Sequence, residues 1–89
     1  MTFRASETFW KHFYDLSVAQ KESVRRAWKI FQQNPFDSRL RSHKIHRLSA
    51  ALGRTVYAAE IEADLRVIFY IEGEIVRTVD IGTHDLYKQ

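Results

Sequence analysis

An acid, a guanidinium and an imidazole fall on one face of a β-hairpin that the sequence predicts near its end. Runs rich in β-branched and aromatic residues at 65–71 and 75–81 flank the short break Glu72-Gly73-Glu74, a pattern typical of a hairpin. Alternate residues of a strand share a face. The polar face then carries Asp64, Arg66, Tyr70, Thr78, Asp80 and His84. Histidine exchanges protons near neutrality and arginine binds phosphate, so this face predicts acid–base chemistry on an anion.

The opposite face of the hairpin is apolar and needs a cover. Its predicted members are Leu65, Val67, Phe69, Ile71, Ile75, Val79 and Ile81. Two amphipathic helices at the start of the chain can supply that cover. Ser6 is placed to cap the first helix, in which Phe9 and Phe13 lie one turn apart. Ser17, with Gln20 three residues later, has the spacing of a capping box and opens the second helix.

The second helix is predicted to end at Asn34, because the proline that follows disfavours helical geometry in the residue before it. The two helices then form a tight hairpin with one shared apolar face, which packs on the sheet. The aromatic residues predicted to lie in this core are Phe9, Trp10, Phe13, Trp28 and Phe31.

A basic stretch follows, between residues 39 and 54, and contains no acidic residue. Its members are Arg39, Arg41, His43, Lys44, His46, Arg47 and Arg54. Such a stretch favours phosphate binding that weakens steeply with salt. The two histidines do not predict a metal site, because the chain has no cysteine and carboxylates are scarce nearby.

Residues 36–51 have neither a helical nor a strand period, and we interpret them as a connecting segment with one short turn near 44–48. A strand is predicted over 54–62, with Tyr57, Ala59 and Ile61 facing inward, and a short edge strand over 2–5. The order is strand, two helices and three strands, which predicts a single α+β domain over residues 1–89 with two layers.

The composition is that of a small domain without disulfide bonds. The chain has 89 residues, 45% of them hydrophobic, and a net charge of +3 that suits an anionic partner. The absence of cysteine suits a reducing cytoplasm. No segment resembles a signal peptide, and none approaches the ~20 apolar residues that span a bilayer. We therefore expect a soluble cytoplasmic protein that does not contact a membrane.

Several short motifs, in this order and over essentially the whole chain, resemble the RelE/ParE superfamily of toxins from type II toxin–antitoxin systems. They are His43-Lys44-Ile45, Tyr57 within a strand, Arg66-Val-Ile-Phe69, and Ile81-Gly-Thr-His84-Asp-Leu-Tyr87. Ile61-Glu-Ala-Asp64 followed by Gly82-Thr-His84 is most similar to the YafQ branch of ribosome-dependent mRNA interferases. Each motif alone is degenerate, but their combination at this length is specific.

The resemblance implies a RelE-like fold, in which an N-terminal strand and a helical hairpin pack on one face of a mainly antiparallel sheet. It implies an endoribonuclease that cuts mRNA in the ribosomal A site without a metal or other cofactor. An antitoxin protein would cover the basic groove or displace Tyr87. The implied catalytic residues are His43, Asp64, Arg66, His84 and Tyr87. The implied RNA-binding residues are Arg41, Lys44, His46, Arg47 and Arg54.

Cutting RNA without a metal requires a base, a cation and an acid. The base takes the proton from the 2′-hydroxyl, the cation stabilises the charge on phosphorus, and the acid protonates the leaving 5′-oxygen. Histidine serves either proton role because its unperturbed pKa of about 6.5 leaves both forms populated near neutrality. Arginine stays charged and offers a planar fork of donors to the phosphate.

The chain departs from the YafQ pattern at two places and from that of RelE at one. Glu60 stands where that branch has a second histidine, Tyr87 follows His84 by three positions where four are expected, and Thr83 stands where RelE has an arginine. Two other functions therefore stay open. One is a ParE-like inhibitor of DNA gyrase without nuclease chemistry, and the other is a relative with the fold but no activity.

Overall fold

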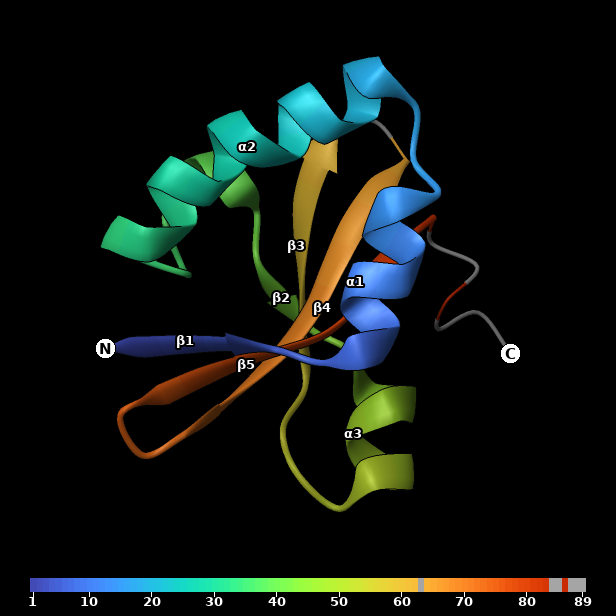
Figure 1. Ribbon diagram of the computed structural model, residues 1–89. Coiled ribbons are helices and arrows are strands. Elements are labelled where there is room, and N and C mark those ends of the chain that lie inside the picture. Colours follow the sequence, from blue (N-terminus) through green and yellow to red (C-terminus); the bar gives the residue numbers. More distant parts are fainter. Residues whose placement is uncertain (63, 84–85, 87–89) are drawn as a thin grey trace.

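Five strands form one sheet in the order β1-β5-β4-β3-β2 (Figure 1). In this computed structural model, residues 1–62, 64–83 and 86 are described. β1 is parallel to β5 and the other neighbours are antiparallel, so the first and last strands of the chain lie side by side. The strands are β1 Thr2–Ala5, β2 His43–Lys44, β3 Tyr57–Glu62, β4 Leu65–Glu72 and β5 Ile75–Gly82.

The predicted helical hairpin is present as α1 (Glu7–Tyr14) and α2 (Val18–Gln33). The Ser6 hydroxyl accepts a hydrogen bond from the Phe9 amide and donates one of 2.6 Å to the Val79 carbonyl, which ties the start of α1 to β5. Ser17 and Gln20 form the predicted capping box of α2. The caps, the helical hairpin, the edge strand 2–5 and the α+β class are all confirmed.

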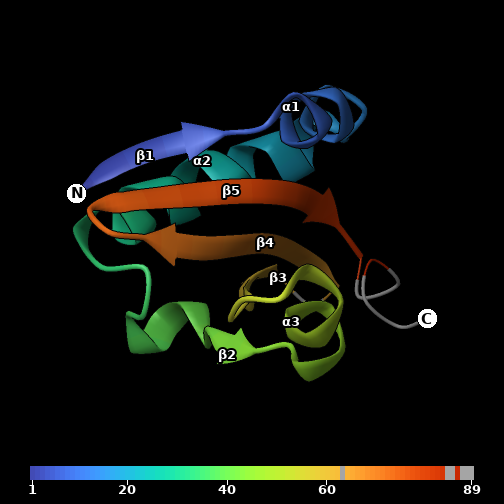
Figure 2. The same ribbon diagram turned by 90° about the horizontal axis from the view of Figure 1, so that it is seen from below.

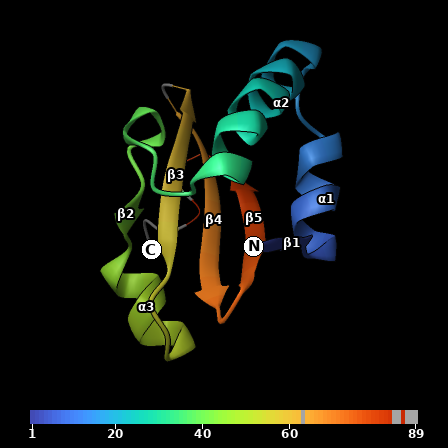
Figure 3. The ribbon, with the colours of Figure 1, turned by 90° about the vertical axis from the view of Figure 1, so that its left-hand side faces the viewer.

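The helices cover one face of the sheet, and Figure 3 shows α2 in front of the strands. Phe69 of β4 is completely buried beneath α2, where its ring meets Phe31 edge to face with 5.0 Å between centroids. Trp10 departs from the prediction, because its side chain is 45% exposed while Phe9 and Phe13 are buried beside it. Apolar aromatic residues at the border of a helical stripe can pack on their neighbours and still face water.

A β-bulge in β5 corrects the predicted faces of the hairpin. Ile68 pairs with Asp80 but Phe69 pairs with Thr78, so Val79 is an extra residue on β5. Thr78 was predicted on the polar face, but it is 3% exposed and lines a small cavity beneath the helices. Its hydroxyl donates to the carbonyl of the neighbouring β1, which satisfies the buried group.

The same pairing moves Ile75 and Val79 away from the helices. Ile75 pairs with Glu72, and directly paired residues share a face. Val79 packs with Ile68 on the side of the sheet opposite Phe69. Alternation alone could not give these faces because one extra residue reverses every position beyond it.

The segment 36–51 is not the irregular connection that its sequence pattern predicted. It contains a 3₁₀ helix at Ser38–Leu40, the strand β2, and a helix α3 at His46–Leu52. Leu48 of α3 packs with Ile45, Val56 and Ile68 on the face opposite α1 and α2. Elements this short carry little periodic signal and are held by tertiary contacts. The following strand, β3, begins at Tyr57, three residues later than predicted.

Within the described ranges, no helix is long and apolar enough to cross a membrane.

Candidate functional site

Arg66 is the centre of the candidate site, on the face of the sheet opposite α2. It pairs in register with Glu60 of β3 on one side and with Gly82 of β5 on the other. The Arg66 Nη1 lies 3.4 Å from the Glu60 Oε1, and the two side chains are only 16% and 27% exposed. The glutamate that replaces the expected histidine therefore forms a half-buried ion pair with the predicted phosphate ligand.

Two nitrogens of the Arg66 guanidinium, Nε and Nη1, are buried and have no hydrogen-bond acceptor within the described part of the chain. The contact with Glu60 neutralises charge but lacks hydrogen-bond geometry. A buried donor left without an acceptor costs about 1–3 kcal/mol. Oxygen acceptors that reached these two nitrogens would remove that cost.

His43 lies on the same face, in the neighbouring row of paired residues. His43 pairs with Ala58, Ala58 with Ile68, and Ile68 with Asp80. This row of paired residues is next to the row formed by Glu60, Arg66 and Gly82. The His43 ring is exposed, and its Nδ1 lies 3.0 Å from the carbonyl oxygen of Arg41. A carbonyl only accepts hydrogen bonds, so Nδ1 carries the proton. In the neutral ring Nε2 then bears the free lone pair, as a general base requires.

The Arg41 carbonyl is aimed at His43 by an unusual backbone. Arg41 has φ 49°, the only positive φ outside glycine in the described residues. A side chain in this region is disfavoured and persists where surrounding contacts hold it. The residue ends the 3₁₀ helix, and β2 begins two residues later.

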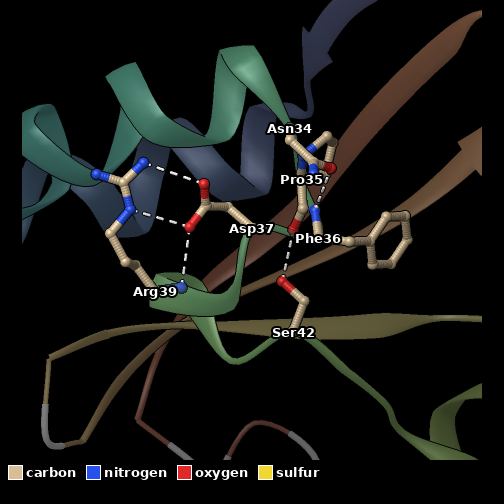
Figure 4. A network of polar contacts seen from close by, with 6 residues as sticks. All are labelled: Asn34, Pro35, Phe36, Asp37, Arg39 and Ser42. Carbon is tan, nitrogen blue, oxygen red and sulfur yellow. Dashed lines mark hydrogen bonds and ion pairs between the residues drawn. The ribbon is translucent and has the colours of Figure 1, made fainter.

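A polar network holds the loop that leads into β2 (Figure 4). Arg39 donates from Nε and Nη2 to the two oxygens of Asp37, each at 3.0 Å. These hydrogen bonds lower the pKa of Asp37 to about 2. The Ser42 hydroxyl donates to the Pro35 carbonyl at 2.6 Å, and the Phe36 amide to the Asn34 side chain. Hydrogen bonds therefore stabilise the loop that precedes His43.

The remaining predicted catalytic residues are Asp64, which precedes β4, and His84 and Tyr87, which follow β5 in the sequence. Asp64 is exposed in the turn before β4. His84 and Tyr87 lie outside the described residues. Leu86, between them in sequence, packs with Ile45 and Ile68 on the same face as Arg66. A Cβ added to Gly82 would meet the Leu86 side chain at 3.1 Å, so this glycine allows the leucine to lie close to β5.

The predicted RNA-binding residues fall into two groups. Arg41, Lys44, His46 and Arg47 are exposed along β2 and the start of α3, beside His43. Arg54 is placed elsewhere, over the ring of Tyr70, and it pairs with Glu72. Arg66 and Tyr70 are four residues apart on β4, which is about 13 Å along a strand. The basic stretch is thus divided between two ends of one face.

One contact near the site is not predicted by the sequence. The Nδ1 of His12 on α1 lies 2.5 Å from the Asp80 Oδ1, and that oxygen also accepts a hydrogen bond from the Ile81 amide. The Asp80 carboxylate, predicted to lie on the polar face, is thus engaged by α1 and by its own strand. No local pattern signals this contact, because it joins residues 68 positions apart in the sequence.

Residues 1–62, 64–83 and 86 contain no group of three or more side chains arranged to hold a metal ion. The chemistry available to the described residues is that of a fixed guanidinium, a histidine with a defined tautomer and a surrounding basic surface.

Solved structures with the same arrangement of elements are toxins of the RelE type. RelE in the archaeal RelE–RelB complex from Pyrococcus horikoshii OT3 has a TM-score of 0.71 and 13% identity, over 92% of each chain. YafQ from Escherichia coli strain BL21(DE3) has a TM-score of 0.68 and 18% identity, over 98% of this chain and 97% of YafQ.

YafQ is also similar in its E. coli complex with DinJ, with a TM-score of 0.64 and 16% identity over 98% of this chain and 97% of that one. The chain therefore has the RelE-like fold from end to end. No protein-family profile matches the sequence. No curated protein matches it either.

Proposed function

We propose that this protein is the toxin of a toxin–antitoxin system and an endoribonuclease that cuts mRNA without a metal ion. The observation that carries the proposal is the Arg66 guanidinium, half-buried on a RelE-like fold, with two donors that lack acceptors among the residues the structure describes. It lies in the row next to a histidine whose Nε2 is free to take a proton. These are the cation and the base that the reaction requires.

The reaction begins with proton transfer from the RNA 2′-hydroxyl to the Nε2 of His43. The 2′-oxygen attacks the adjacent phosphorus, and Arg66 stabilises the negative charge that accumulates on the phosphoryl oxygens. His84 gives a proton to the 5′-oxygen as the bond to phosphorus breaks, leaving a 2′,3′-cyclic phosphate and a 5′-hydroxyl. Asp64 orients a catalytic group, and Tyr87 stacks on an unpaired base.

The basic surface beside His43 binds the RNA backbone. Arg41, Lys44, His46 and Arg47 are exposed on one side of the site and can neutralise phosphates that flank the cut. We propose that the ribosome presents mRNA in its A site, so that cleavage follows the codon register in the cytoplasm.

A protein partner that silences the toxin is part of the proposal. RelE was solved with RelB and YafQ with DinJ, and both are similar in fold to this chain. We propose a cognate antitoxin that binds over the basic surface around His43. Binding there would exclude RNA.

A primer-extension map of a reporter mRNA in a translating extract tests this function. Added protein should produce cuts in codon register, and the His84→Ala variant should produce none while remaining folded. Arg25→Ala is the matched control, since Arg25 is exposed on α2 and pairs only with its helical neighbour Glu22. If the extract translates normally and the message stays intact, the nuclease proposal fails. Inhibition of gyrase supercoiling in a parallel assay would then identify a ParE-like toxin.

A further inference from the structure

A second group of cationic side chains lies at the far end of the same face. Arg4 of β1 pairs in register with Arg77 of β5, and Arg77 pairs in register with Tyr70 of β4. Directly paired residues share a face, so these side chains form a row across three strands. Arg54 lies over the Tyr70 ring, with 4.3 Å between its Cζ and the ring centroid. We call Arg4, Arg54, Tyr70 and Arg77 the arginine cluster.

The arginine cluster holds more positive charge than the fold balances. Glu72 is the carboxylate that serves it, accepting from the Arg77 Nε at 2.9 Å and from the Arg54 Nη1 at 3.2 Å. These bonds, the one from Arg77 foremost, lower the pKa of Glu72, so it is ionised at neutral pH. Two of the three guanidinium groups, those of Arg54 and Arg77, therefore share one carboxylate.

Arg4 in particular has no counter-ion in the described part of the chain. Among the residues that the structure describes, none forms an ion pair with its side chain, although it stands beside Arg77 in the row. Like charges in directly opposed strand positions destabilise a sheet. The fold gains nothing from this charge, and an anion bound at the row would stabilise it.

The surface above the arginine cluster is open. Figure 2 shows β1, β5 and β4 side by side with α2 behind them, and α3 in front of the β3 side only. The side chains of Arg54, Glu72 and Arg77 are 43%, 47% and 40% exposed. A strand laid across this face would meet the arginine cluster at one end of β4 and Arg66 at the other, about 13 Å away.

We propose that the arginine cluster is a second binding site for single-stranded RNA. Arg4 and Arg77 contact phosphates, and an unpaired base stacks on the Arg54 guanidinium, whose other face rests on Tyr70. Guanidinium planes and aromatic rings are the platforms on which proteins hold unstacked RNA bases. The choice of RNA over an acidic peptide rests on the proposed nuclease function and on this stack, which a peptide carboxylate does not use.

Equilibrium binding tests the proposal without requiring cleavage. The probe is a short single-stranded oligonucleotide with 2′-O-methyl riboses, titrated with the full chain at several salt concentrations. Arg4→Ala should weaken binding several-fold and reduce the slope of log affinity against log salt by about 0.7, the value for one phosphate contact on a single strand. Its melting temperature should not fall, because Arg4 has no ion pair to lose. Arg77→Gln should weaken binding similarly, and Arg25→Ala should leave affinity and slope unchanged.

The proposal is overturned if Arg4→Ala and Arg77→Gln bind the oligonucleotide as Arg25→Ala does. It is also overturned if a poly-glutamate peptide binds through Arg4 while the oligonucleotide does not. Loss of RNA binding in Arg4→Ala, in a protein that never cleaves mRNA in the extract, would uphold the arginine cluster and reject the nuclease function. The two proposals can therefore fail separately.

Discussion

Arg66 and Glu60 show how one substitution changes the character of the site. A glutamate directly across from the arginine pairs with its charge, yet two guanidinium donors have no acceptor within the described residues. A phosphate can meet those donors only by competing with the glutamate. In the proposed reaction, the pair therefore balances preorganisation of the arginine against attraction for the substrate.

The contact between the His43 ring and the Arg41 carbonyl predicts the tautomer of this histidine. The Arg41 carbonyl accepts from Nδ1, so the neutral ring should carry its proton there and leave Nε2 unprotonated. Long-range proton–nitrogen NMR spectra distinguish the two tautomers directly. His43→Ala should lower the cleavage rate by ~10²–10⁴ without unfolding the domain. A ring protonated at Nε2 in its neutral form would remove His43 as the base.

Asp37 provides a pH prediction. Its hydrogen bonds from Arg39 lower its pKa from 3.8 to about 2. Because the folded-state pKa lies below the unfolded one, the carboxylate stabilises the loop fully above pH 3.8, and this contribution disappears as the pH falls toward about 2. An NMR titration of the Asp37 carboxyl carbon should have its midpoint near the lower value, and Arg39→Ala should raise it. A midpoint of 3.8 in the parent protein would show that the network in Figure 4 does not form in solution.

The hydrophobic core under α2 is centred on β4. Phe69 is fully buried and contacts Phe31 of α2 together with Phe36 and Tyr57. Phe69→Ala should lower the free energy of unfolding by about 3–5 kcal/mol. That is a large share of the ~5–15 kcal/mol typical of a domain. Denaturant unfolding measures the loss, with Val18→Ala as the control, because Val18 is 79% exposed. A loss for Phe69→Ala no larger than the control's would contradict the packing described.

The elements that sequence predicted well are those with local signals. Ser6 and Ser17 cap their helices through bonds to residues three positions away, so both helix starts could be read from spacing. The bulge at Val79 and the helix α3 have no such signal, because each depends on contacts across the sheet. Their omission led to the wrong face for Thr78 and to the irregular connection predicted over 36–51.

The candidate site likewise contains residues that could be predicted from the sequence and contacts that could not. His43 and Arg66 could be named because their chemistry and their likeness to a known family coincide. The pairing of Glu60 with Arg66 depends on register, and the row of Arg4 with Arg77 depends on parallel pairing of the two ends of the chain. The contact of His12 with Asp80 requires α1 to reach a bulged strand. None of these relations is contained in the spacing of residues along the chain.

For the whole molecule, the two faces of the sheet have separate tasks. One face carries the larger part of the core beneath α1 and α2. The other face carries a smaller buried cluster beneath α3, together with Arg66, His43, the basic stretch and the arginine cluster. Substitutions on the second face can therefore change function while the core stays intact. This separation makes a functional test of single residues interpretable.

The most direct test of the nuclease function is the single-turnover rate of mRNA cleavage on programmed ribosomes by the parent protein, Arg66→Ala and Arg25→Ala. Arg66→Ala should cleave ~10²–10³-fold more slowly, because it removes the cation that stabilises the phosphorus centre. Arg25→Ala should cleave at the parental rate, and circular dichroism should show all three proteins folded. Cleavage by folded Arg66→Ala at the parental rate would contradict the role given to Arg66 and the site built around it.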